Sequence, residues 1–421
     1  MKSDFISRRR ELKDRRNAAQ SLVTDDSQPL ASPGRAHLSL ERTEPTRFGS
    51  GWISGVLSVA LGLAGLGAVF CFHFPSFLTM PALRDLYPLP WVRAVVHVVL
   101  VASFLLGSTS LCLRYNKALG VAGISLTLIA ALLGGSRVPI DDELTKGPFL
   151  GLDWFLLNLI LYSLVYVPLE RVFAKNPEQD IFRNEWRTDL SYFFVNTLLI
   201  QLTSLMTLVP AMVLFDWARH PALVSSMSAL PFLLQLAGVL LVADFTQYWV
   251  HRAFHAVPAL WRFHAVHHSA TTMDWLAGSR LHLVDALATR AATYIPVYIL
   301  GFSQPAVFAY VVLVVIQATF IHANVRWELR PVRRIVATPS FHHWHHAAER
   351  DAVDKNFAVH TPLWDLLFGT FYLPNRWPAA YGLCGESDMP QGWLRQFVYP
   401  FRRRSKTATL AASNASCEER V

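Results

Sequence analysis

The chain has 421 residues, of which 52% are hydrophobic and only 16% charged, and its formal net charge is +8. Soluble domains carry roughly 25% charged residues, so this composition excludes an ordinary soluble enzyme and favours an integral membrane protein. The basic residues flank apolar tracts, which is typical of signals that orient membrane helices and argues against nucleic-acid binding. The four cysteines show no CxxC spacing and predict neither a disulfide framework nor a thiolate metal site.

The apolar tracts predict an all-α membrane protein with about six to eight transmembrane helices. Residues 1–48 are polar and basic, and we expect a disordered cytosolic tail without a signal peptide. Six tracts follow, each close to the ~20 residues that cross a bilayer. They cover residues 53–74, 94–113, 118–136, 154–169, 190–215 and 228–243. A last apolar region, 286–321, is interrupted at 301–305 and predicts two short helices in a hairpin or a re-entrant pair.

The distribution of basic residues predicts the orientation. With the N-terminus in the cytosol, the inner loops hold most of the Lys and Arg residues and the outer loops hold few. This assignment places residues 244–285 and 322–421 on the cytosolic side. The excess of Arg over Lys and the Ala/Leu-rich tracts favour a bacterial inner membrane.

Three histidine clusters follow the sixth tract, and two of them repeat the pattern HxxHH. Residues at i, i+3 and i+4 share one face of a helix, so each cluster projects its imidazoles in one direction. The clustered histidines are His251, His255, His264, His267, His268, His342, His345 and His346. One ion rarely takes more than about six protein donors, so eight imidazoles predict two ions in a cytosolic, histidine-rich helical cap.

The spacing leaves the identity of the metal open, because imidazole binds zinc, iron, copper and nickel alike. No HExxH motif is present, and no base carboxylate stands beside the clusters, which favours redox chemistry over hydrolysis. A non-catalytic zinc-binding or metal-transport protein is the alternative from another class. A transporter places its ligands at mid-membrane on broken helices, whereas these clusters lie at the ends of tracts.

The segment from Asp244 to Thr370 resembles the fatty acid hydroxylase superfamily, which includes sterol desaturases, sterol methyl oxidases and alkylglycerol monooxygenase. The matching stretches are 244–255, 261–269, 279–282, 322–324, 338–346, 354–357 and 364–370. The resemblance implies a non-haem di-iron oxygenase that hydroxylates a fatty acyl, sterol-like or ether lipid with O2 and external electrons. Desaturation or demethylation at the same site is the alternative.

The resemblance also assigns roles to particular residues. It implies that the eight clustered histidines are ligands, with His322 as a ninth. His282 is a candidate only, because the proline that usually follows it is replaced by Leu283. His343 is expected not to bind metal. The residues that could support the ligands from behind are Asp244, Tyr248 and Asn324.

Alternatives stay open for several of these supporting positions. Asp244 precedes His251 by seven residues and could accept its ring N–H, or could pair with an arginine at the helix end. Tyr248 and Trp249 are expected to be interfacial anchors. Residues 364–370 are expected to form a turn that locks the third cluster.

Cofactors, partners and domains follow from the same resemblance. We expect two iron ions, with zinc possible on purification, and O2 as co-substrate. No haem-binding segment or CxxC motif is seen, so a separate cytochrome b5- or ferredoxin-type protein is expected to supply electrons. The sequence divides into a tail (1–48), a four-span region of unassigned role (49–170), a catalytic membrane domain (171–376) and a cytosolic C-terminal tail (377–421). The oligomeric state is left open.

Overall fold

The computed structural model describes residues 50–84, 86–140, 148–384 and 389–402, so the expected tail at 1–48 lies outside the described residues. Within these ranges the secondary structure is helical, apart from two isolated β-bridges. Eight helical segments are long and apolar enough to cross a membrane. They are α2 (Trp52–His73), α5 (Leu89–Leu113), Ala118–Arg137 beginning with α6 (Ala118–Leu132), α7 (Leu152–Val172), Ile200–Ala218 beginning with α9 (Ile200–Phe215), α11 (Phe232–Ala256), α13 (Leu283–Leu300) and α14 (Gln304–His322). The prediction of an all-α, multi-pass membrane protein is confirmed.

Shorter elements connect these helices and cover their ends. The α-helices among them are α3 (Pro75–Leu78), α4 (Pro81–Arg84), α8 (Trp186–Leu198), α10 (Pro221–Ser228), α12 (Pro258–His268), α15 (Pro339–His345), α16 (Leu363–Phe368) and α17 (Trp393–Val398). The 3-10 helices are η1 (Gly135–Arg137), η2 (Asp216–Ala218), η3 (Ala277–Ser279), η4 (Arg350–Ala352) and η5 (Tyr399–Phe401). Residues 389–402, expected to belong to a tail, fold back so that Phe397 accepts a hydrogen bond from His282.

Two apolar tracts differ from their predicted form. The tract at 190–215 is divided at Leu199 into α8 and α9, although no Gly or Pro marks the break. Tertiary hydrogen bonds hold α8 at this end, because the Asn196 side chain donates to the Leu281 carbonyl and Gly151 donates to the Leu198 carbonyl. The tract at 228–243 continues as α11 to Ala256. The first histidine cluster therefore lies inside the same helix.

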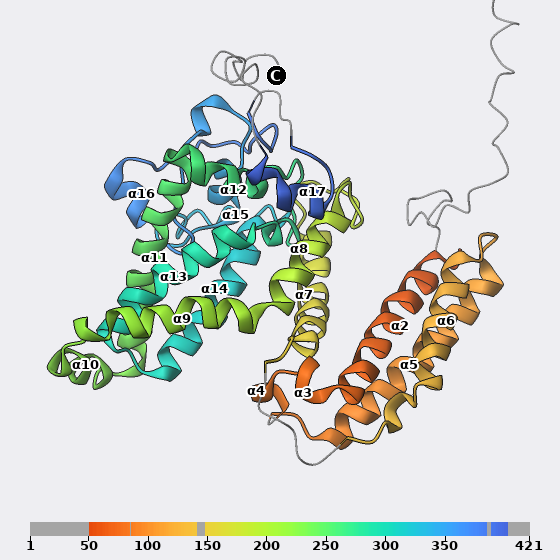
Figure 1. Ribbon diagram of the computed structural model, residues 1–421. Helices are drawn as coiled ribbons and strands as arrows, with labels where there is room; N and C mark the ends of the chain where they lie inside the picture. Colours follow the sequence, from red (N-terminus) through yellow and green to blue (C-terminus); the bar gives the residue numbers. More distant parts are fainter. Residues whose placement is uncertain (1–49, 85, 141–147, 385–388, 403–421) are drawn as a thin grey trace, which may run out of the picture. The chain divides into compact units, whose positions relative to one another are not determined.

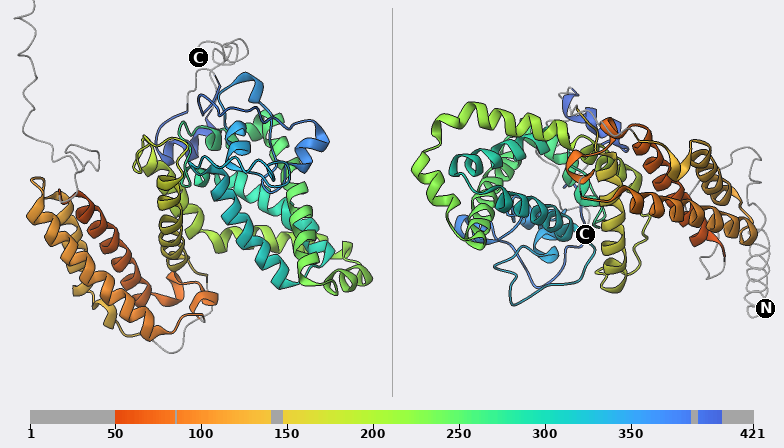
Figure 2. Two further views of the ribbon diagram at one scale, coloured as in Figure 1. Left: turned by 180° about the vertical axis from the view of Figure 1, so that it is seen from behind. Right: turned by 90° about the horizontal axis from the view of Figure 1, so that it is seen from below.

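The first three long helices form a bundle of their own. In Figures 1 and 2, α2, α5 and α6 run alongside one another. Glycine and serine residues lie at their contacts. Ser58 and Ser103 each donate a hydrogen bond to the other's backbone carbonyl, at 2.7 and 2.8 Å. A Cβ atom on Gly123 would lie 1.9 Å from the Ser58 hydroxyl, so only glycine permits this approach.

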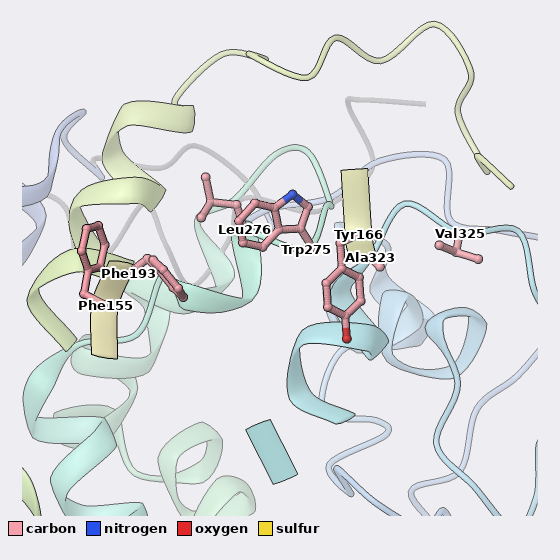
Figure 3. Packing of buried hydrophobic residues seen from close by; sticks show 7 residues of the cluster. All are labelled: Phe155, Tyr166, Phe193, Trp275, Leu276, Ala323 and Val325. Atoms are coloured by element: carbon pink, nitrogen blue, oxygen red, sulfur yellow. The ribbon is translucent and has the colours of Figure 1, made fainter. Parts of the chain in front are cut away.

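Helix α7 shares a core with the later helices, although the sequence grouped it with the first three. Phe155 and Tyr166 of α7 belong to one buried cluster with Phe193 of α8 and with Trp275 and Leu276 (Figure 3). The Tyr166 and Trp275 rings stack at 6.4 Å. This packing extends to Ala323 and Val325, directly after α14, and so fixes one side of the histidine-bearing region.

Three membrane-helix ends meet where the histidines lie. Helix α11 contacts α12, α13 and α14, and α14 contacts α15. The C-terminal ends of α11 and α14 and the N-terminal end of α13 face the same region, as expected for consecutive antiparallel helices (Figure 1). The hairpin predicted for the last apolar region is present. Gly301, with φ 73°, ends α13 before α14 begins.

Candidate metal centre

The structure brings all nine predicted ligand histidines together in two groups. The first group consists of His251, His255, His264, His268 and His345. The second group consists of His267, His322, His342 and His346. Within each group, one ring nitrogen per residue lies within 4.8 Å of the others. We call them the five-histidine group and the four-histidine group.

The paired histidines of the two HxxHH motifs explain why there are two groups. Neighbouring residues on a helix point about 100° apart, so adjacent side chains diverge. His267 and His268 of α12 therefore enter different groups, with ring planes 86° apart. His345 and His346 diverge in the same way, with ring planes 88° apart. Each motif contributes ligands to both groups.

Six of the nine rings donate their Nδ1–H to an acceptor that cannot donate in return. The backbone carbonyl acceptors are Phe357 for His251, Lys355 for His345, Arg280 for His267 and Ala318 for His322, at 2.6–3.1 Å. The carboxylate acceptors are Asp285 for His264 and Asp354 for His255, at 2.6 and 3.1 Å. A neutral imidazole has only one N–H, so each of these rings presents a bare lone pair on Nε2.

These lone pairs point at one another. The Nε2 atoms of His251 and His264 are 2.9 Å apart, and those of His267 and His322 are 3.3 Å apart. Two lone pairs at this distance repel unless a cation lies between them. A metal–nitrogen bond of about 2.1 Å separates neighbouring ligand nitrogens by about 3.0 Å in octahedral and about 3.4 Å in tetrahedral geometry. The donor set and its spacing therefore fit one metal ion in each group.

Burial keeps the rings neutral. Desolvation and the neighbouring imidazoles hold the pKa of the six histidines on α12 and α15, or directly after α15, well below the ordinary value. These are His264, His267, His268, His342, His345 and His346. Neutral imidazole is the form that binds metal ions. Three buried Nε2 atoms of the five-histidine group, on His255, His268 and His345, have no hydrogen-bond partner within the described ranges.

The backbone conformation of residues 354–357, one of the matching stretches, explains the residue types found there. Asp354 and Asn356 both adopt left-handed backbone conformations, with φ of 56° and 60°. Asp and Asn tolerate this region better than other non-glycine residues. The Lys355 carbonyl between them accepts the His345 ring N–H, and the Asn356 amide donates to the Phe341 carbonyl of α15.

His282 and His343 lie outside both groups. The His282 Nδ1 accepts a hydrogen bond from the Val284 amide and caps α13, while Nε2 donates to the Phe397 carbonyl. Both ring nitrogens are therefore engaged with the backbone. His343 is fully buried between the Tyr381 hydroxyl, at 2.9 Å, and the His322 carbonyl, at 3.3 Å.

Both alternatives for Asp244 are wrong. Its carboxylate accepts backbone N–H groups from Val359, His360 and Thr361 at 2.9–3.2 Å. Within the described residues it forms neither a hydrogen bond with the His251 ring nor an ion pair with an arginine. The loop it holds begins with Phe357, whose carbonyl is the partner that His251 uses. Asp244 therefore supports the centre through the backbone.

Residues 364–370 form helix α16 and a turn, and they support the same loop from the other side. Gly369, with φ 74°, ends the helix. The Asp365 carboxylate accepts the amides of Phe357 and Ala358 at 2.8 and 2.9 Å and the Thr370 hydroxyl at 2.6 Å. The turn thus holds the partner of His251 in the first cluster.

The expectation of an interfacial anchor fails for Tyr248. This residue is fully buried, and its hydroxyl lies 3.0 Å from the Thr370 hydroxyl, whereas Trp249 is 41% exposed. Asn324 contacts no histidine ring. Its side chain pairs with both backbone groups of Asn176 and so fixes the chain after α14.

The charged residues behind His267 were not predicted from the sequence. Arg280, whose carbonyl accepts the His267 N–H, forms an ion pair with Asp189 at 2.5 Å. Asp189 also pairs with Arg183, and Arg183 with Asp274, both at 2.6 Å. We call these four buried residues the ionic lattice. Their partners lie up to 91 positions apart in the chain, so no local pattern signals them.

Two further residues support the ligand rings. Asp285, three positions after His282, accepts the His264 ring N–H. Gly278 allows the His322 ring to approach, because a Cβ atom there would lie 2.9 Å from the ring Nδ1.

Comparison with known proteins places the centre in a family context. Residues 236–370 match the family model described as fatty acid hydroxylase. Ornithine lipid hydroxylase OlsE of Rhizobium tropici is 32% identical over 42% of this chain and 53% of its own length. Alkylglycerol monooxygenase of Homo sapiens is 34% identical over 33% of this chain and 31% of its own. Methylsterol monooxygenase 1-2 of Arabidopsis thaliana is 27% identical over 34% and 48%.

The matches with these relatives span about half of their length or less. No solved structure matches the chain significantly. The shared region contains every histidine of both groups. The ionic lattice extends beyond it to Arg183 and Asp189.

Proposed function

We propose that this chain, which carries a fatty acid hydroxylase domain at residues 236–370, is a membrane oxygenase that hydroxylates a lipid at a pair of iron ions. The observation that carries the proposal is the convergence of nine imidazoles in two groups, with six Nδ1–H groups directed outward so that Nε2 lone pairs face inward. The proposed ligands are the members of the two groups, and His282 is left out.

The residues around the ions have separable tasks. The imidazoles hold the ions, and the backbone carbonyls and carboxylates behind them fix the ring tautomers. Burial of the rings excludes water from the site. A bound iron pair supplies the O2 activation and redox chemistry that oxidation of an alkyl C–H bond requires. O2 is the co-substrate, and a separate cytochrome b5- or ferredoxin-type protein supplies the electrons.

The relatives favour oxygen insertion over the alternatives. By their names, they are hydroxylases or monooxygenases of ornithine lipid, alkylglycerol and methylsterol. A lipid substrate agrees with a centre formed at the ends of three membrane helices, where an apolar chain can enter from the bilayer. The position at helix ends also disfavours a transporter, whose ligands lie at mid-membrane. The positive-inside rule supports a centre on the cytosolic side, and the excess of Arg over Lys supports a bacterial inner membrane.

Metal analysis of the purified full-length chain tests the site. We expect about two iron ions per chain, and His267→Ala, which removes a ligand of the four-histidine group, should lose metal together with O2-dependent activity. One ion or none in well-folded wild-type protein would contradict the paired centre.

Lipid profiling by mass spectrometry, with and without the gene, tests the reaction. We expect one lipid class to gain the mass of one oxygen atom when the gene is present. A loss of two hydrogen atoms would identify a desaturase instead. An unchanged profile would leave only a non-catalytic protein.

A further inference from the structure

We infer that Arg290 and Tyr294 of α13 bind the anionic group, a carboxylate or a phosphate, of the lipid that this protein oxidises. The inference rests on the proposed lipid chemistry and adds the charge of the substrate to it. The inference is carried by Arg290, which lies inside a membrane helix and has no acidic partner among the described residues.

Arg290 lies on the packed face of α13. Positions 286, 290, 293 and 297 share one face of a helix, and the other three residues, Ala286, Thr293 and Val297, are buried. Arg290 itself is half-buried in the middle of this face. A charged side chain within a membrane span is costly and is usually functional.

The described contacts of Arg290 leave its charge uncompensated. Its guanidinium donates one hydrogen bond, at 2.8 Å, to the Thr203 hydroxyl of α9. No ion pair among the described residues includes it. Asp285, the acidic residue of the same helix, is engaged by the His264 ring and the Thr289 hydroxyl. Most of the guanidinium donors therefore remain available to a ligand.

Tyr294 provides a second donor beside it. Residues four apart on a helix are neighbours on its surface, so the Tyr294 hydroxyl and the Arg290 guanidinium lie on one face. Tyr294 is half-buried, and its hydroxyl has no hydrogen-bond partner in the described part of the chain. The planar fork of arginine matches carboxylate and phosphate oxygens, and a phenol adds a further donor to the same anion.

The site lies on the helix that also supports the metal centre. Asp285, which accepts the His264 ring N–H, precedes Arg290 by five residues, or about 7.5 Å along the helix axis. An anion at Arg290 and a carbon at the histidine centre can therefore belong to one lipid molecule.

Binding of matched amphiphiles to the full-length protein in a neutral detergent tests the inference. Dodecanoate, dodecyl phosphate and dodecanol share one alkyl chain and differ in charge, and inorganic phosphate is the chain-free probe. By calorimetry, we expect both anionic amphiphiles to bind at least about tenfold more tightly than dodecanol, and inorganic phosphate to bind weakly. Arg290→Gln should abolish the preference for the anions, Arg290→Lys should retain part of it, and Tyr294→Phe should reduce it.

Arg219→Gln is the matched control. Arg219 also contacts α13, with its guanidinium 4.5 Å from the Tyr298 ring centre, but it has the Asp216 carboxylate 3.9 Å away. We expect its substitution to leave the preference for the anions unchanged.

Several results would overturn the inference. They are equal binding of the three amphiphiles by the wild type, a preference that survives Arg290→Gln, or inorganic phosphate binding as tightly as dodecanoate. Metal content is measured in parallel: loss of iron from the wild type counts against the proposed function, whereas lost anion preference with two ions present counts against this site alone.

Discussion

The two histidine groups differ in what stands behind their rings. In the five-histidine group, two rings donate to carboxylates, those of Asp285 and Asp354, and two donate to carbonyls. In the four-histidine group, only carbonyls accept, from His267 and His322. A carboxylate partner makes an imidazole a stronger donor. The two sites are therefore not equivalent, and the five-histidine group should hold its ion more tightly.

The groups also depend on different parts of the chain. All the acceptors behind the five-histidine group lie between residues 285 and 357, inside the region shared with the fatty acid hydroxylase model. The four-histidine group depends on the Arg280 carbonyl, which the ionic lattice fixes from outside that region. One group is thus self-contained, and the other relies on residues that precede the shared domain.

The largest effect on metal binding is expected from single ligand substitutions, one made in each group. His342→Ala leaves three imidazoles in the four-histidine group, whereas His255→Ala leaves four in the other. We expect His342→Ala to weaken its ion by more than about 100-fold, so that the protein purifies with one ion per chain, while His255→Ala stays close to two. Metal analysis with chelator competition measures both. Equal losses in the two variants would show that the groups are equivalent.

The ionic lattice offers a more selective change. Asp189→Asn leaves the buried guanidinium groups of Arg183 and Arg280 without full compensation, which should destabilise the fold by about 3–5 kcal/mol. Through the Arg280 carbonyl it should also weaken the ion of the four-histidine group by about 10- to 100-fold. Chelator competition should find the other ion unaffected.

Asp285→Asn is the matched variant, because Asp285 supports His264 of the five-histidine group. It should weaken only the ion of that group. If Asp189→Asn and Asp285→Asn weaken the same ion, the two supports are not independent.

Acid should act on both groups alike once metal has been removed. In the unfolded chain the imidazoles bind protons with a pKa near 6.5, whereas burial holds the folded pKa of residues such as His268 and His346 well below that value. The unfolded state therefore binds more protons below pH 6.5, and each such ring costs about 1.4 kcal/mol of stability per pH unit. The melting temperature of the chelated protein should fall between pH 7 and pH 5.5. A constant value would show that the rings are not buried as neutral groups.

The smallest effect is expected at His282, which lies outside both groups. His282→Asn keeps a side-chain oxygen at the start of α13 to accept from the Val284 amide, so stability should change by about 1 kcal/mol or less. Metal content should stay at two ions per chain. Loss of an ion from this variant would return His282 to the ligand set.

The ligands were predictable because they repeat within single helices. His264, His267 and His268 follow helical spacing, so the sequence alone shows that they share a face. The apolar tracts were predictable for a similar reason, since hydrophobic length depends only on local composition. The resemblance to fatty acid hydroxylases then supplied His322, which stands alone in the sequence.

The supports behind the ligands were not predictable, because they depend on tertiary contacts. Asp189 meets Arg280 across 91 positions, and Asp244 binds a loop more than 110 positions later. The break between α8 and α9 at Leu199 has the same origin. Tyr248 was misplaced because an aromatic residue near the end of a membrane helix resembles an anchor until the loop that covers it is known.

The meeting of helix ends at the metal centre affects the stability and abundance of the protein in the cell. Two bound ions would tie α11, α12, α14 and α15 together across almost a hundred residues, as crosslinks that only the folded chain can form. Ligands that bind only the folded state raise its stability in proportion to the logarithm of their free concentration. With the proposed iron pair bound, the abundance of this protein should follow the iron supply, and proteases should remove the chain when iron becomes scarce.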